Sequence, residues 1–181
     1  MFDPTAFENM KVVLEGIIYD RDFEGSILVT DRQDLVNISS LSRSFLMEME
    51  LKNGRSTTCA PIKCSISLEA GLKNLSAELL EYKGGADAGC HIETIYQIPL
   101  KDDKQADSDS LFRTLSNIWG SSREIEITEK HIYRSPEQSA RIIMAKVVFG
   151  RLVTEEQIPD FTDLVDHAII SINELEHIYS D

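Results

Sequence analysis

The sequence has few cysteines and no long apolar run. Its three cysteines, Cys59, Cys64 and Cys90, are odd in number and widely spread, which is not the pattern of a disulfide framework. No apolar stretch reaches the roughly 18 residues that a membrane-spanning helix needs. The first residues, Met1-Phe2-Asp3-Pro4, lack the basic and apolar regions of a secretory signal. We therefore expect a cytoplasmic protein that does not enter a membrane.

Basic residues are missing from the C-terminal part of the chain. Residues 155–181 hold eight acids and no Lys or Arg, a net charge of −8. Residues 1–31 hold seven acids and two bases, a net of −5, whereas residues 32–154 sum to zero. Such acidic ends repel a phosphate backbone, so no nucleic-acid binding is expected. They suit either a solvated surface or a docking surface for a basic protein partner.

The 181 residues are enough for one domain, and an apolar content of 42% is enough for a core. We expect a single α+β domain over residues 1–181, in which an antiparallel sheet packs against helices on one face. The all-polar stretch at 101–109 predicts an exposed loop.

Strand patterns are clearest between residues 45 and 68. Apolar residues alternate with mostly polar ones from Phe45 to Leu51 and again from Ile62 to Leu68. Asn53-Gly54 is typical of a hairpin turn, and 55–60 reads as a short return strand. The pattern predicts a three-stranded antiparallel meander at 45–68. Further strands are predicted at 92–100 and 123–133.

Apolar residues at helical spacing predict helices elsewhere. A stripe from Phe7 to Ile18 follows the helix-start residues Asp3-Pro4, although 12–19 also fits a strand. Residues 111–119 predict a short helix, and 72–82 fits either a helix or a strand. Beyond Pro159, the spacing from Phe161 to Ile178 predicts an amphipathic C-terminal helix.

The segment 135–149 supports two interpretations. Ser135-Pro136-Glu137-Gln138 matches a capping box with Pro at the first helical position, which favours a buried helix over 140–149. The β-branched residues of that segment would suit a central strand equally well. We favour the helix, lying between the sheet and the C-terminal helix.

One acidic stretch has the spacing of a cation-binding loop. Asp20 to Asp31 carries acids at its first, third, fifth and twelfth positions and Gly25 at its sixth, and it resembles an EF-hand calcium loop. Glu24 and Leu28 depart from that family's pattern, and no second loop accompanies it. The resemblance implies a divalent-cation site in the 20–31 loop. The alternative is an acidic turn that leads into a strand over 27–30.

The remaining candidate sites are less complete. Gly84 to Gly89 lacks the Lys-Ser or Lys-Thr of a phosphate-binding loop. Cys59, Cys64, Cys90 and His91 do not have the spacing of a zinc site, and Cys64 falls on the apolar face of its strand.

The last predicted helix carries two further pairs. Glu174 and His177 form a single Glu-x-x-His pair, whereas di-iron bundles need two copies and two more glutamates. Asp163 precedes His167 by four residues and suggests a surface pair.

No catalytic, cofactor-binding or metal-binding residue is assigned from these patterns. The leading hypothesis is a non-enzymatic protein-interaction or regulatory domain that docks a basic partner on its acidic ends, and a homo-oligomer is possible. The alternative is a domain that binds a divalent cation or a small ligand through the 20–31 loop.

Overall fold

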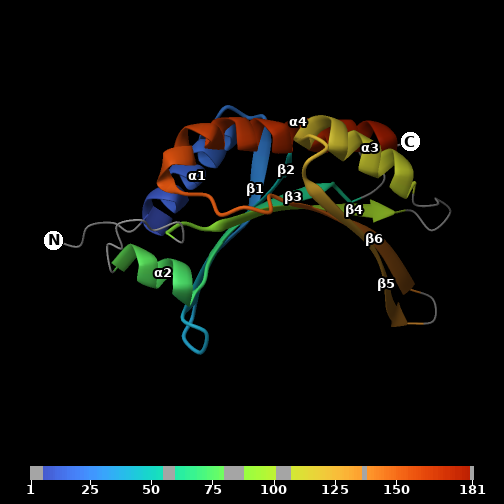
Figure 1. Cartoon of the computed structure of the whole chain (residues 1–181). Coiled ribbons are helices and arrows are strands. Elements are labelled where there is room, and N and C mark those ends of the chain that lie inside the picture. The colour runs from blue at the N-terminus through green and yellow to red at the C-terminus, as the bar shows by residue number, and fades with distance from the viewer. Residues whose placement is uncertain (1–5, 55–59, 80–87, 101–106, 136–137, 180–181) are drawn as a thin grey trace.

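Six antiparallel strands form one sheet, which carries helices on one face (Figure 1). The structure is a computed structural model and describes residues 6–54, 60–79, 88–100, 107–135 and 138–179. The strand order is β1-β2-β3-β4-β6-β5. The strands are β1 (Ile27–Asn37), β2 (Ser42–Leu51), β3 (Lys63–Ala70), β4 (His91–Leu100), β5 (Glu124–Ser135) and β6 (Gln138–Val148). The helices are α1 (Ala6–Phe23), α2 (Leu72–Leu79), α3 (Ser108–Trp119), the 3-10 helix η1 (Glu155–Asp160) and α4 (Phe161–Tyr179). The expected α+β class is confirmed.

The two-residue alternation of the strands makes the sheet one-sided. Met49, Cys64, Tyr96 and Ala145 lie in one row across β2, β3, β4 and β6, and all four are fully buried. Helices α1, α3 and α4 cover this face, and none of the described helices lies over the centre of the opposite face of the curved sheet (Figure 1). The buried face is the one that alternation in the sequence predicts for β2, β3 and β4.

The meander differs from the prediction in one respect. β2 pairs directly with β3, with Phe45 opposite Leu68. No strand therefore lies between them, although a return strand was expected at 55–60. Residues 55–59 of that segment lie outside the described part of the chain. The meander is instead completed by β1, which pairs with β2 on its other side.

The predicted helix over 140–149 is wrong, because this segment is strand β6. β6 pairs with β4 on one side and β5 on the other. Ile143, Ala145 and Val147 are fully buried, whereas the alternate residues Met144 and Lys146 are only partly buried. The less buried face of β6 also carries the apolar residues Ile142, Met144 and Val148, so apolar residues run nearly unbroken and hide the two-residue period. The Ser135 that suggested a helix cap pairs with Gln138 at the end of the β5–β6 hairpin.

The remaining helix predictions hold within the described residues. Segment 6–23 is a helix rather than a strand, and 72–79 of the ambiguous segment is also helical. α3 begins at Ser108, inside the predicted polar loop, because the Asp107 carboxylate accepts a hydrogen bond of 2.9 Å from the Ser110 amide. α4 is confirmed and packs beside α1. Among the described helices none is long and apolar enough to cross a membrane.

A short bridge fixes the chain that follows β6. Cys90 and Val153 exchange two backbone hydrogen bonds of 2.8 Å. Gly89 precedes the bridge with a φ of +154°, and a Cβ there would lie 2.3 Å from the Val153 carbonyl oxygen. Only glycine therefore permits this approach. The bridge holds residues 150–154 against the start of β4 and so positions η1 and α4.

Candidate ligand-binding pocket

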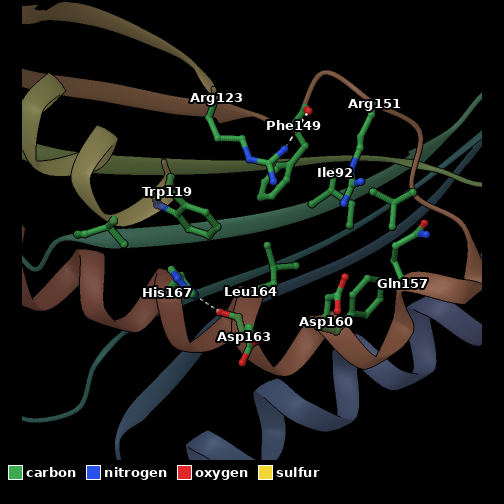
Figure 2. A pocket seen from close by; sticks show the side chains of 13 residues that line it. Ile92, Trp119, Arg123, Phe149, Arg151, Gln157, Asp160, Asp163, Leu164 and His167 are labelled. Carbon is green, nitrogen blue, oxygen red and sulfur yellow. Dashed lines mark hydrogen bonds between the residues drawn. The ribbon is translucent and has the colours of Figure 1, made fainter. Parts of the chain in front are cut away.

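A pocket of about 180 Å³ opens where the end of α3, the end of β6 and the start of α4 come together (Figure 2). Three parts of the chain that are far apart in sequence supply its walls, namely Ile92 of β4, residues 118–123 and residues 149–167. The apolar lining is Ile92, Ile118, Trp119, Phe149, Val153, Phe161 and Leu164, and the polar lining is Arg123, Arg151, Gln157, Asp160, Asp163 and His167. The pocket is thus mainly apolar, with a few polar groups at its edges, as ligand pockets usually are.

Trp119 forms the aromatic wall and is held from behind. Its ring meets Phe149 edge-on, with centroids 5.5 Å apart, and lies 5.6 Å from the His167 ring. The indole N–H donates to the Tyr96 hydroxyl and to Ser171 Oγ, both at 3.1 Å and both buried. Ser171 Oγ in turn donates to the His167 carbonyl oxygen at 2.8 Å. These bonds fix the indole before any ligand arrives.

Two arginines form the cationic wall. The Arg123 guanidinium lies 4.5 Å from the centroid of the Phe149 ring, and its Nη1 donates to the Phe149 carbonyl oxygen at 3.2 Å. Burial, and then the positive charge of Arg151, lower the pKa of Arg123, although an arginine stays protonated. Within the described part of the chain neither guanidinium has a carboxylate partner in an ion pair. Arg21 and Arg32, by contrast, are both paired.

The opposite wall belongs to η1 and α4. His167 Nδ1 lies 2.6 Å from the Asp163 carbonyl oxygen, which can only accept, so Nδ1 carries the hydrogen. Nε2 of the neutral ring is then an acceptor. Gln157 Oε1 is already used by the amide and hydroxyl of Thr154, at 2.8 and 3.0 Å. Asp160 is exposed and stands across the pocket from Arg151 in Figure 2.

The residues of the proposed EF-hand loop do not converge. Asp20 and Asp22 lie in the last turns of α1, and β1 begins at Ile27. Asp22 Oδ2 accepts a hydrogen bond of 3.3 Å from the Val29 amide, so this carboxylate supports the turn. Nowhere among the described residues do three or more His, Cys, Asp or Glu side chains gather as a metal site. The predicted strand from residue 27 is confirmed.

The cysteines and His91 are also separate. Cys64 and Cys90 are fully buried, and Cys90 Sγ lies 3.8 Å from Met10 Sδ, whereas His91 is exposed. Burial raises the pKa of the Cys90 thiol to about 12, and it raises the pKa of Cys64 further. Both behave as small core residues rather than as nucleophiles or ligands. Cys59 and residues 84–87 of the glycine-rich segment lie outside the described residues.

The candidate pairs of α4 are partly revised. Asp163 and His167 interact, but through the main-chain oxygen of Asp163 rather than its carboxylate. Glu174 and His177 lie exposed near the other end of the helix, away from the pocket.

Many acids of the two ends are used inside the fold. Glu15 pairs with Arg32 at 2.6 Å, and Asp166 pairs with Arg21 at 2.8 Å, which links α4 to α1. Glu176 is 3% exposed. The net charge of the ends therefore overstates the acidity that the surface presents.

The arginine wall was not predicted from the sequence. Trp119 was predicted only as the end of a short helix at 111–119, and Arg123 only as the start of a strand at 123–133. Their meeting with Arg151 and Phe149 depends on the pairing of β5 with β6, which no local pattern encodes. Comparisons with protein-family models, curated proteins and solved structures give no match for this chain. Function has to be inferred from the pocket itself.

Proposed function

We propose that this chain is a non-enzymatic domain that binds a small anion with an apolar body in the pocket between α3, β6 and α4. The supporting observation is the pair of guanidinium groups, Arg123 and Arg151, which lie beside the aromatic wall without a carboxylate partner in the described residues. Carboxylates are plentiful in a chain of net charge −13. Two arginines at one pocket without a carboxylate partner among the described residues therefore support an anion-binding role.

The physics favours an anionic ligand. Burial lowers the pKa of Arg123 most, and the positive charge of the nearby Arg151 lowers it further, because two like charges close together destabilise each other. A carboxylate or phosphate between them would remove that repulsion and accept charge-assisted hydrogen bonds. A dry cavity of roughly 150 Å³ holds benzene, so about 180 Å³ suits a ligand with one ring or one branched chain.

Calorimetric titration with 3-phenylpropanoate and with inorganic phosphate tests this proposal. We expect 3-phenylpropanoate to bind and Arg123→Gln or Arg151→Gln to weaken it by at least about tenfold, since a hydrogen bond to a charged group contributes about 1.5–3 kcal/mol. Arg113→Gln, at an exposed position of α3 outside the pocket, is the matched control and should leave binding unchanged. Phosphate that binds more tightly would indicate a plain anion site. If neither anion binds, or if Arg113→Gln weakens binding equally, the proposal is wrong.

A second candidate function is docking of a basic protein. It is supported by the packing of α1 against α4, which brings the two acidic ends of the chain to one side of the molecule (Figure 1). Glu156 and Glu174 remain exposed there and do not line the pocket. Binding of lysine-rich peptides should weaken with added salt and in a Glu156→Gln, Glu174→Gln double variant. Unchanged binding in that variant would exclude this surface.

A further inference from the structure

We propose that the ligand is a zwitterion, namely a free α-amino acid with an apolar side chain. The inference rests on the proposed anion-binding function and names its ligand class. The pocket has a wall of each charge: Arg123 and Arg151 on one side and Asp160 on the other (Figure 2).

Asp160 can bind a cationic group of the ligand, because no described basic residue pairs with it. It is exposed, lines the same cavity as Arg151, and forms no ion pair with it or with any other described basic residue. Charges of opposite sign that face one cavity without touching each other fit a ligand that carries both signs. An α-amino acid has its ammonium and carboxylate on one carbon, which suits a cavity of about 180 Å³.

The imidazole provides a second partner for the ammonium. Because His167 Nδ1 donates to the Asp163 carbonyl oxygen, Nε2 of the neutral ring can accept a hydrogen bond. The face of Trp119 attracts a cation as well as an apolar group, whereas the Phe149 ring already carries the Arg123 guanidinium. Along this wall the ammonium of the ligand has the Asp160 carboxylate at one end and the His167 ring nitrogen beside Trp119 at the other, while the carboxylate of the ligand faces the guanidinium groups.

The side chain of the amino acid would lie against apolar residues. Leu164 and Phe161 from α4 and Ile92 from β4 line the pocket together with the aromatic wall. A carboxylate or amine on the ligand side chain would have to be buried against these groups, which is costly without a partner. The lining therefore favours leucine-like or phenylalanine-like side chains over charged ones.

The test compares three ligands that differ by one group: phenylalanine, 3-phenylpropanoate, which lacks the amine, and 2-phenylethylamine, which lacks the carboxylate. Leucine is added to allow for a smaller side chain. In calorimetric titrations we expect phenylalanine or leucine to bind at least about tenfold more tightly than either truncated ligand.

Variants assign the two ends of the ligand. Asp160→Asn should weaken amino-acid binding by about tenfold and leave 3-phenylpropanoate unaffected, whereas Arg151→Gln should weaken both. Glu174→Gln, at an exposed acid of α4 outside the pocket, is the control, and thermal unfolding checks that each variant is folded.

The outcomes separate this inference from the proposed function. If 3-phenylpropanoate binds as tightly as the amino acids, or Asp160→Asn affects both ligands equally, the zwitterion is overturned but anion binding stands. If none of the four ligands binds, both proposals fail.

Discussion

The covered face of the sheet is sealed at one end and open at the other. Below α1, Phe7, Met10 and Leu14 join Phe45 and Met47 of β2 in the core, and all five are inaccessible to solvent. At the start of α4 the same face ends in the pocket, where Phe149 is only partly buried. A regular apolar stripe closes the first region, whereas the second is built from the ends of elements, where arginines and aspartates interrupt the apolar pattern. An opening in this core therefore arises where helices and strands end.

The largest effect should come from shortening a leucine to alanine, once in the sealed core and once at the pocket. Leu14→Ala leaves a cavity in the sealed core and should lower the free energy of unfolding by about 3 kcal/mol. Leu164→Ala enlarges a space that already opens to solvent, so we expect a loss smaller by about 1 kcal/mol. Urea unfolding of both variants measures the difference. Equal losses would mean that the pocket is as well packed as the core.

A smaller effect should follow from Trp119→Phe. The change keeps a ring against Phe149 but leaves the buried acceptors Tyr96 and Ser171 without the indole donor. We expect unfolding to become easier by about 1–2 kcal/mol. Ser171→Ala, which leaves the indole bonded to Tyr96, should cost less. A larger loss in Ser171→Ala would show that the indole does not depend on these bonds.

The smallest effect should be pH-dependent and confined to the sealed end, where Lys11 joins Glu8 at 2.6 Å and Asp34 at 2.9 Å. The hydrogen bond from Lys11 lowers the pKa of Glu8, against burial and with help from Arg43. Burial would raise the pKa of Asp34, but Lys11 and Arg43 lower it overall. Because folding lowers the pKa values of Glu8 and Asp34, their ion pairs stabilise the folded protein at pH values above the unfolded-state pKa values of 4.5 and 3.8. This stabilisation is lost as the pH falls through the folded-state pKa values.

Lys11→Met is the variant that measures this contribution. It should cost at most about 1 kcal/mol at pH 7, because the acids are partly exposed. The difference from the unchanged protein should shrink as the pH is lowered below about 4. Chemical unfolding at pH 7, 5 and 3.5 tests it. A difference that grows in acid would contradict the sign.

The contrast between the two regions also explains what could be predicted from sequence. Strands β2, β3 and β4 and helix α4 each show a regular apolar period along their own sequence, and their buried faces were predicted correctly. β6 was not, because Ile142, Met144 and Val148 on its less buried face are apolar as well, so the strand shows little alternation. The capping-box residues Ser135 to Gln138 also pointed to a helix.

The pocket could not be predicted because it is a property of tertiary structure. Arg123 and Arg151 are separated along the chain by the whole β5–β6 hairpin, and only the pairing of those strands brings them to one cavity. The acidic ends, which composition made prominent, are partly neutralised by Arg32 and Arg43, which lie outside these segments and pair with Glu15 and Glu8. Net charge gives the sum over a segment, whereas recognition depends on which individual charges lack a partner.

The bridge between Cys90 and Val153 ties two distant parts of the chain into one cooperative unit. Its two amide hydrogens are each bonded to the other residue, so neither can exchange with solvent unless the start of β4 and the wall of the pocket separate together. Opening of the pocket wall and fraying of β4 are therefore a single event, and a molecule seated in the cavity would slow hydrogen exchange at both amides by the same factor.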